Sequence, residues 1–168
     1  MVLARKPRPR LLALLLVAAL AGCGGGKPAG PASKSVQGEG FSFTAAPSWV
    51  VSSAGNSTSA SHGVDRLEVL RFTLEKTYRP ALFAPTAREL DSVAARLATS
   101  LGGRVATGST VRVAGQQARS YRLLYGRERT LEIAFVLSGK TEYELLCRRL
   151  VRTPDTACRQ FFGTFALG

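Results

Sequence analysis

Histidine, tryptophan and methionine occur only once each in the 168 residues, and cysteine occurs three times. This scarcity leaves little material for imidazole catalysis or for a metal cluster built from histidine and cysteine ligands. No glycine-rich segment has the spacing of a P-loop or of a dinucleotide-binding turn. Acidic residues are also few, since 11 Asp and Glu stand against 23 Lys and Arg, a formal net charge of +12. With 45% hydrophobic residues, the composition indicates a single folded domain with a basic surface.

The start of the chain has the order of charged and apolar residues that is typical of a secretory signal. Four basic residues within the first ten precede an unbroken apolar run over residues 11–21. This run is shorter than the about 20 residues that a permanent membrane helix needs, so it predicts the core of a signal peptide. No later apolar run approaches the length of a membrane span, and we expect no transmembrane helix.

The apolar run ends in Leu20-Ala21-Gly22-Cys23, which resembles the lipobox of bacterial lipoproteins. The resemblance implies a signal peptide at residues 1–22, cleavage before Cys23 and acylation of its thiol. The alternative is an ordinary signal peptide with an incidental cysteine nearby. Cleavage would remove four basic residues and no acidic one, so the formal charge would fall from +12 to +8. We therefore expect covalent lipid on Cys23 to hold the protein at the extracytoplasmic face of the cell membrane, through two or more acyl chains.

Residues 23–39 contain almost nothing that a core could bury. Their sequence, CGGGKPAGPASKSVQGE, is rich in glycine, proline, alanine and serine, which predicts a flexible tether. A flexible coil of about 17 residues spans roughly 20–25 Å root-mean-square. We expect the folded part over residues 40–168, as one domain and as a monomer.

Alternating apolar residues predict several strands in the folded part. In chain order, the prediction is a strand at 41–43, a polar loop at 52–63, and strands at 66–74, 111–113, 121–125, 131–137 and 141–150. Turns at 114–115 and 138–139 separate two pairs of these strands. Some strands carry apolar residues on both parities, for example Ala134 beside Ile133, and this pattern favours a sheet that is covered on both faces.

A helix is predicted after residue 85. Thr86 is placed as its N-cap, and Glu89, three residues on, as the second member of a capping box. Gly102 and Gly103 end the helix. The apolar residues between these ends recur with a period of about 3.6 and predict the buried face, which consists of Leu90, Val93, Ala94, Leu97 and Leu101.

A second helix is predicted near the end of the chain. Thr153 would cap it, Pro154 would occupy its first position, and Asp155 supplies an acid in its first turn. Its predicted inner face consists of Cys158, Phe161, Phe162 and Phe165.

Cys147 and Cys158 are the cysteines that remain once Cys23 is lipidated, and the expected compartment permits disulfides. Cys147 lies near the end of the last predicted strand, and Cys158 lies on the inner face of the last predicted helix. A bridge between them would close a loop of about a dozen residues and add roughly 2–3 kcal/mol to the free energy of unfolding. The alternatives are two buried thiols or a redox or metal pair, although the chain offers neither CxxC spacing nor a nearby histidine for the latter.

Three landmarks follow one another along residues 40–168. They are a Phe-Ser-Phe strand leading to Pro47 and Trp49, a hairpin with the pattern Val111-x-Val113-x-Gly115-x-x-Ala118-x-x-Tyr121, and a phenylalanine-rich final helix. This layout resembles the PsbP-like fold, named for an extrinsic subunit of photosystem II. Relatives of that fold include a small eukaryotic regulator that binds the GTPase Ran and many actinobacterial lipoproteins. The resemblance implies an α+β fold, an antiparallel β-sheet covered by helices on both faces (an α/β/α sandwich), which serves mainly as a protein-binding module. The family has no shared catalytic motif, so no functional residue is carried over.

Ser61, His62 and Asp65 are the one set of residues that could suggest hydrolysis, and all three fall in the predicted polar loop. A nucleophile and its base need a rigid scaffold, and the chain has no Gly-x-Ser-x-Gly elbow. Glu142 and Glu144 are two apart on a predicted strand and share a face, and we expect them to pair with arginine rather than to act as an acid–base couple. We expect no enzyme activity, no cofactor and no metal.

The aromatic residues allow two interpretations. Trp49, Tyr121, Tyr125 and Tyr143 belong to types that are enriched at binding surfaces. Sheets also bury such residues, and we expect these four to belong to the core.

The arginines are the remaining functional hint. Alternate strand residues share a face, so some of them could form a basic patch that favours anionic lipid headgroups, an acidic cell-wall polymer or an acidic protein. On the alternative interpretation, 18 Arg against 5 Lys reflects the codon usage of a GC-rich genome, and the arginines are ordinary solvated charges. The proposed patch consists of Arg119, Arg122, Arg127 and Arg129, and a second cluster near the cysteines consists of Arg148, Arg149 and Arg152.

Two functions are therefore expected as alternatives. The first is a non-catalytic protein-binding module at the cell envelope, with an envelope protein as its unidentified partner. The second is a carrier or sensor of a small amphiphilic ligand held between sheet and helix. A binding module should have a filled core and an exposed patch, and a carrier should have an apolar cavity. Large residues expected in the core favour the first; they are Phe72, Phe135, Phe161 and Phe162. Nucleic acid is not an expected partner outside the membrane.

Overall fold

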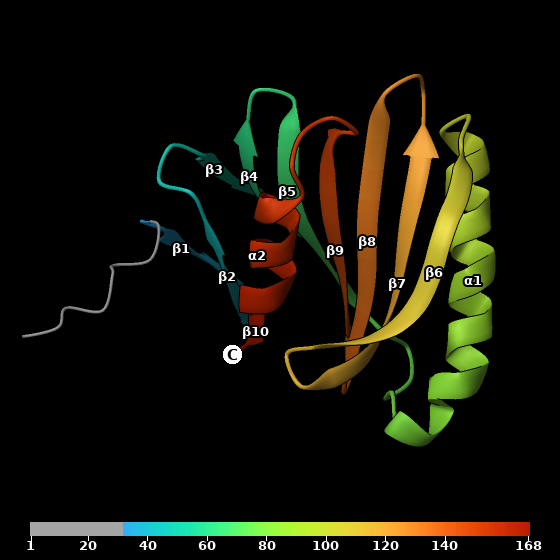
Figure 1. Cartoon of the computed structure of the whole chain (residues 1–168). Coiled ribbons are helices and arrows are strands. Elements are labelled where there is room, and N and C mark those ends of the chain that lie inside the picture. Colours follow the sequence, from blue (N-terminus) through green and yellow to red (C-terminus); the bar gives the residue numbers. More distant parts are fainter. Residues whose placement is uncertain (1–31) are drawn as a thin grey trace, which may run out of the picture. The chain divides into compact units, whose positions relative to one another are not determined.

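The computed structural model describes residues 32–168, so the predictions for residues 1–22 and for Cys23 lie outside the described residues. The main element is a seven-stranded antiparallel sheet with the spatial order β3-β4-β5-β9-β8-β7-β6 (Figure 1). A small sheet with the order β1-β2-β10, two α-helices and a short 3-10 turn complete this part. The bounds are β1 Lys34–Gly38, β2 Phe41–Ala45, β3 Val50–Ala54, β4 Ser57–His62, β5 Asp65–Thr73, η1 Pro80–Leu82, α1 Phe83–Ser100, β6 Arg104–Val113, β7 Gln116–Tyr125, β8 Arg129–Ser138, β9 Thr141–Leu150, α2 Thr156–Thr164 and β10 Ala166–Leu167.

Strand β8 lies between β9 and β7 and is buried along most of its length. Ile133 and Phe135 belong to one apolar cluster, together with Leu90 of α1. Ala134 belongs to the other cluster, together with Phe161 of α2. The side chains that pack with α1 and those that pack with α2 therefore alternate along the strand, as the two apolar parities in the sequence require.

The antiparallel strands and the two helices agree with the predicted α+β class. Strand β9 covers Thr141–Leu150, as predicted, and β5 differs from its predicted range by one residue at each end. The turn between β6 and β7 falls at Ala114 and Gly115, both with positive φ, as a tight hairpin requires. No helix in residues 32–168 is long and apolar enough to span a membrane.

The predicted polar loop at 52–63 is wrong, because most of this segment forms the hairpin of β3 and β4. All side chains of β3 are exposed, whereas β4 buries Thr58, Ser59 and Ala60. Strand β4 pairs along its whole length with β5, so backbone hydrogen bonds to a well-predicted neighbour hold it in place. Serine and threonine fill β4, and the apolar alternation on which the prediction relied is therefore missing.

Helix α1 begins at Phe83, and the predicted capping box at Thr86 is wrong. Thr86 lies inside the first turn, where its hydroxyl donates a hydrogen bond of 2.8 Å to the carbonyl oxygen of Leu82. Pro85 is tolerated there because the first N–H groups of a helix have no partner within it. The C-terminal end agrees with the prediction, since Gly102 follows the helix with φ +64°.

Helix α2 begins at Thr156 with Asp155 at its N-cap, two residues later than Thr153 would place it. Its Cys158 is bonded to Cys147 of β9, with the two Cα atoms 5.6 Å apart. The exposed fractions of these cysteines are 0% and 2%. The predicted disulfide is confirmed, and it fixes α2 to the strand beneath it.

The predicted tether extends too far, because Lys34–Gly38 form the strand β1, which pairs with β2. Within β1 only Val36 is buried, so a single apolar residue was the whole signal for a strand. Strand β10 pairs with the other edge of β2, with Leu167 opposite Phe41. A strand of two residues has no periodicity to detect.

Candidate functional site

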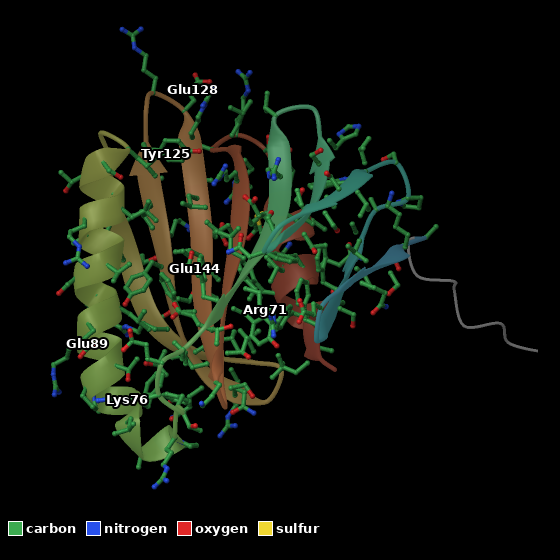
Figure 2. All side chains as sticks on the ribbon, turned by 180° about the vertical axis from the view of Figure 1, so that it is seen from behind. Arg71, Lys76, Glu89, Tyr125, Glu128 and Glu144 are labelled. Carbon is green, nitrogen blue, oxygen red and sulfur yellow. A yellow bond between two sulfur atoms is a disulfide. The ribbon has the colours of Figure 1, made fainter. Side chains whose placement is uncertain are left out.

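Helix α1 covers only part of the sheet face on which it packs. It contacts β6 and β7, and β9 and β5 lie farther along the sheet, beside the helix (Figure 2). We call this strip beside α1, over β9 and β5, the α1 groove. On this face β9 presents its alternate side chains, which are Glu142, Glu144, Leu146, Arg148 and Leu150.

The hollow near the C-terminal end of α1 has a volume of about 490 Å³, and we call it the basic hollow. Arg66, Arg129 and Arg148 line it from the three adjacent strands β5, β8 and β9. Arg66 and Arg148 are direct cross-strand partners. None of the described residues that line this hollow is acidic; besides Arg149, its remaining lining residues are Val64, Leu97, Leu101, Tyr125, Leu131, Leu146 and Leu150.

Glu68 orients two of these arginines. Its carboxylate is 2.9 Å from Arg66 and 3.6 Å from Arg148, and it accepts a hydrogen bond of 2.8 Å from the hydroxyl of Ser57. Burial would raise the pKa of Glu68, but the hydrogen bonds from Arg66 and Ser57 and the two positive charges lower it below its ordinary value. Glu68 is therefore ionised at neutral pH. Arg66 and Arg148 share this one carboxylate, and Arg129, the third arginine of the hollow, forms no ion pair within residues 32–168.

The hollow near the N-terminal end of α1 has a volume of about 730 Å³, and we call it the acidic hollow. Glu142 and Glu144 lie on its floor, and Glu75 and Glu89 line it as well. Figure 2 shows Glu144 on the sheet beside α1 and Glu89 on the helix. Among the described residues that line it, Lys76 is the single basic one; the large apolar ones are Leu74, Leu82, Leu90, Val93 and Leu137.

Glu142 and Glu144 form no hydrogen bond or ion pair within residues 32–168, so their expected pairing with arginine is wrong. Their cross-strand neighbours on this face are apolar, including Phe72 opposite Glu142 and Phe135 opposite Glu144. Burial raises the pKa of Glu142. Burial, followed by the negative charge of Glu142, raises the pKa of Glu144 to about 7. The two carboxyl groups are thus held in a poorly solvated position, and neither forms an ion pair with a cation of residues 32–168.

Large apolar side chains remain exposed at both hollows. Leu82 at the acidic hollow is 47% exposed, and Leu101 and Val64 at the basic hollow are 36% and 69% exposed. Phe72 on β5, which was expected in the core, lies opposite Glu142 on the same face of the sheet and is 40% exposed. Single exposed apolar residues are common, but a group of them along one hollowed strip marks a surface suited to binding.

The structure does not assemble the predicted basic patch. Arg119 and Arg122 are an odd number of residues apart on β7 and therefore point to opposite faces. Arg119 forms an ion pair of 2.9 Å with Asp91 of α1, and Tyr121 donates a hydrogen bond of 2.6 Å to the same carboxylate. Arg127 is an exposed residue of the β7–β8 turn. Of the four predicted residues, only Arg129 lines the basic hollow.

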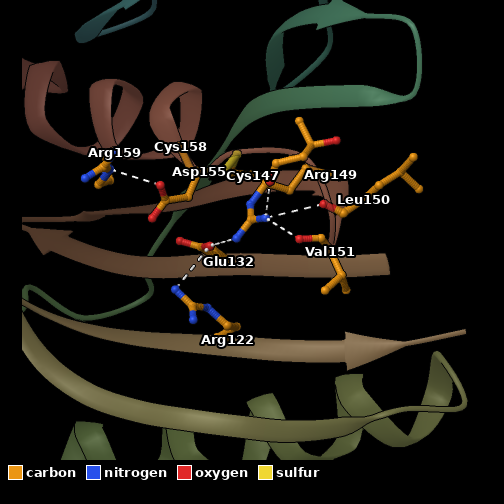
Figure 3. A network of polar contacts seen from close by, with 10 residues as sticks. Arg122, Glu132, Cys147, Arg149, Leu150, Val151, Asp155, Cys158 and Arg159 are labelled. Carbon is orange, nitrogen blue, oxygen red and sulfur yellow. Dashed lines mark hydrogen bonds and ion pairs between the residues drawn. A yellow bond between two sulfur atoms is a disulfide. The ribbon is translucent and has the colours of Figure 1, made fainter. Parts of the chain in front are cut away.

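Arg122 belongs instead to a network on the other side of the sheet (Figure 3). Glu132 lies between Arg149, at 2.9 Å, and Arg122, at 3.5 Å. Arg149 also donates hydrogen bonds to three backbone carbonyl groups, the shortest being 2.7 Å to Thr153. The exposed fractions of the Arg149 and Glu132 side chains are only 10% and 14%. This network holds the loop between β9 and α2, beside the disulfide, and its role is structural.

The aromatic residues are mostly core, as expected. Trp49, Tyr121 and Tyr143 are 8%, 4% and 6% exposed. Tyr125 is the exception, since it lines the basic hollow.

The β4–β5 hairpin ends with Ser61, His62 and Asp65, and no side-chain hydrogen bond joins these three residues within the described part of the chain. His62 is the cross-strand partner of Asp65, and its ring stacks on Trp49 at 6.2 Å. Ser61 precedes His62 on β4 and points to the other face. Residues 32–168 contain no group of three or more His, Cys, Asp or Glu that could hold a metal ion.

The sequence alone does not associate Arg66 and Arg148 with Arg129. Periodicity shows which residues of one strand share a face, but it does not show which strand lies alongside. The register of β5 with β9 and of β9 with β8 brings these arginines together. If the order of these strands in the sheet had been known, the three arginines could have been predicted to lie side by side.

No protein family model matches the sequence, and no curated protein matches it. Solved structures do share the fold. The solution structure of the cyanobacterial PsbP, CyanoP, from Synechocystis sp. PCC 6803 is similar, with a TM-score of 0.55 and 12% identity over 89% of this chain and 99% of that chain. A crystal structure from Bacteroides thetaiotaomicron is similar, with a TM-score of 0.52 and 12% identity over 77% of this chain. The chain spans 45% of the length of that protein. These likenesses support a PsbP-like fold.

Proposed function

We propose that this chain is a lipid-anchored extracytoplasmic lipoprotein whose PsbP-like domain, an α/β/α sandwich of the actinobacterial lipoprotein type, acts as a non-catalytic protein-binding module at the cell envelope. The α1 groove is the docking surface. The observation that carries the proposal is the combination, on one strip, of exposed apolar residues with the charged residues Glu142, Glu144 and Arg129, which have no partner of opposite sign within residues 32–168. Phe72 is 40% exposed there, and Glu144 has a pKa of about 7.

The filled interior supports docking over carriage of a ligand. Phe43, Phe135 and Phe161 are among the largest side chains that are fully buried, and they occupy the two apolar clusters. Both hollows are open clefts at the surface. A flat or cleft-like surface with apolar and charged residues is what a protein partner needs.

A carrier of a small anionic amphiphile is the second candidate. The basic hollow favours it, since its volume of about 490 Å³ and its floor of leucine side chains under arginines would suit a short acyl chain with an acidic head. Extraction of the purified protein with organic solvent, followed by mass spectrometry, distinguishes the candidates. A stoichiometric lipid would establish the carrier.

The anchor is tested by Cys23→Ala. Without the thiol no acyl chain can be attached, so the variant should leave the membrane fraction or accumulate with residues 1–22 still attached. The matched control is Cys147→Ala together with Cys158→Ala, which removes the disulfide and leaves the anchor. Unchanged membrane association of Cys23→Ala would exclude the lipoprotein.

Docking is tested by affinity capture with the full-length chain from detergent-solubilised envelope, at about 0.15 M salt and at 1 M salt. Long-range charge attraction is screened at the higher salt, so a protein that is retained there is bound by contact. Phe72→Ser should release it, and Val51→Ser, with a similar exposure of 42%, should not. Retention of mixed anionic material alone, lost at high salt, would contradict the proposal.

A further inference from the structure

We infer that the α1 groove binds an extended segment of a partner protein that carries a cationic side chain at one end, apolar side chains in the middle and an anionic side chain at the other end. This inference rests on the proposed docking function and specifies the chemistry of the partner.

The floor of the groove changes its charge along a single strand. On one face of β9, Glu142 and Glu144 are followed by Leu146 and then by Arg148. Four residues of extended backbone separate Glu144 from Arg148, which places their Cα atoms about 13 Å apart. A partner segment that lies along β9 in an extended conformation therefore needs two opposite charges about four residues apart to pair with both ends of the groove. Its cation must lie over Glu142 and Glu144, and its anion over Arg148.

The acidic end of the groove is a hollow with two carboxyl groups that could pair with a cation. Glu142 and Glu144 have no hydrogen-bonding or charged partner within residues 32–168. A lysine or arginine side chain from the partner would supply N–H donors to both carboxylates. Leu70 and Phe72, the cross-strand neighbours of Glu144 and Glu142, would contact the methylene stem of that side chain.

The basic end of the groove has three arginines and only one carboxylate, Glu68, that pairs with any of them. Arg66 and Arg148 share the carboxylate of Glu68, and Arg129 has no ion pair within residues 32–168. A guanidinium group carries five N–H donors in a planar fork, so donors remain for a carboxylate of the partner. Leu131 and Leu146 line the hollow beneath these arginines and would contact apolar side chains next to that carboxylate.

The presence of both charges favours a protein segment over a lipid. An anionic lipid would satisfy the arginines but would leave Glu142 and Glu144 without a cation. A zwitterionic headgroup has both charges, but they lie on neighbouring groups and cannot span the distance between Glu144 and Arg148. A polypeptide places side chains of either sign at any spacing along an extended backbone.

The experiment is site-specific photocrosslinking of the full-length chain in its own membrane. A photoreactive phenylalanine analogue replaces Phe72 at the acidic end or Val64 at the basic end, at sites that are 40% and 69% exposed. The control site is Val51, which is 42% exposed and, by its register through Ala60 to the core residue Leu67, points to the other face of the sheet. The crosslinked peptides are identified by mass spectrometry.

Charge variants are combined with each crosslinker. Arg129→Glu places a like charge against the anionic end of the partner and should reduce adduct formation about tenfold. Arg127→Glu is the matched control, because Arg127 is exposed, is two residues away and lines neither hollow. At the acidic end Glu142→Gln with Glu144→Gln should reduce the adduct, and Glu128→Gln, in the β7–β8 turn, should leave it unchanged.

The inference is supported if both sites capture one segment of one protein, with Lys or Arg near the Phe72 adduct and Asp or Glu near the Val64 adduct. A protein segment without that pattern overturns the inference and leaves the docking function standing. Protein adducts from Val51 alone would also overturn the inference, and they would place the docking surface on the other face of the sheet. Adducts with lipid, or with a second copy of this chain, also overturn the inference, and lipid adducts support the carrier. The absence of adducts from all three sites overturns both the inference and the proposed function.

Discussion

Glu142 and Glu144 project from β9 to the same face, and the negative charge of Glu142 adds to burial in raising the pKa of Glu144 to about 7. The ordinary value is 4.5, so between about pH 4.5 and pH 7 the folded chain holds a proton that the unfolded chain releases. The free energy of unfolding therefore decreases as the pH rises through this window, and this contribution is constant above it.

Glu144→Gln removes this proton and the charge that replaces it. Relative to the wild type, the variant should gain roughly 1–2 kcal/mol of stability between pH 4.5 and pH 8, a value discounted for solvent screening of a half-buried group. Urea unfolding of both proteins at several pH values measures the difference. Glu128→Gln, at an exposed turn, is the control and should show no such trend. A difference between Glu144→Gln and wild type that does not vary with pH would contradict the raised pKa.

Arg149→Ala should destabilise the protein more than the substitution of an exposed arginine does, because the Arg149 side chain is only 10% exposed. It leaves Glu132 with only the longer contact to Arg122 and removes donors from the carbonyl groups of the β9–α2 loop. Loss of one partner of a largely buried ion pair costs about 3 kcal/mol. Arg152→Ala is the control, because the side chains of Arg152 and its partner Glu128 are 76% and 61% exposed and such pairs contribute less than about 1 kcal/mol. Equal unfolding midpoints for the two variants would refute a structural role for Arg149.

Removal of the disulfide by Cys147→Ala with Cys158→Ala should lower the free energy of unfolding by roughly 2–3 kcal/mol, which corresponds to about 6–10 °C in Tm. Calorimetry measures this change. Because both cysteines are buried, the bond in the native protein should also resist mild reductants until the chain unfolds. Rapid reduction under native conditions would show that α2 opens readily from β9.

Ala114→Asn should stabilise the protein by about 1 kcal/mol. Ala114 occupies the first position of the β6–β7 turn with φ +49°, a left-handed conformation that is costly for alanine and better tolerated by asparagine. Gly115→Ala is the opposite test, since Gly115 has φ +76° and a side chain there is strained. Thermal unfolding should place the wild type between these two variants, and the reverse order would refute the strain at Ala114.

The sequence predicted the elements with strong periodicity and missed those held by long-range pairing. Strand β9 and the Cys147–Cys158 bond follow from local pattern and from the number of cysteines. Strand β4 does not, because its serines and threonines carry no alternation and it is held by hydrogen bonds to β5. The prediction of a capping box at Thr86 was wrong because it relied on a local signal that is weak compared with the contacts of the helix. A side-chain cap contributes about 1 kcal/mol, and the helix instead continues upstream through Phe83 to the 3-10 turn before it.

The sequence predicts the part of the candidate site that lies on β9, but not the part that neighbouring strands contribute. The pattern Glu142, Glu144, Leu146, Arg148 on one strand face is visible in the sequence, and it contains the change of charge along the groove. Arg66 is more than 80 positions from Arg148 in the sequence, yet the two are cross-strand partners. Whether a carboxylate lacks a partner depends on such distant neighbours, so the raised pKa of Glu144 could not be foreseen.

The hairpin of β1 and β2 would have a mechanical consequence if the proposed anchor held the chain by its N-terminal side. Lys34 pairs with Ala45 at the open end of the hairpin, and Gly38 pairs with Phe41 at its closed end. A pull that enters at Lys34 loads these pairs one after another, as in a zipper, and never all together as in shear. Peeling the five residues of β1 would release about 17 Å of chain. The seven-stranded sheet would stay intact meanwhile, so β1 can yield under load while the groove keeps its shape.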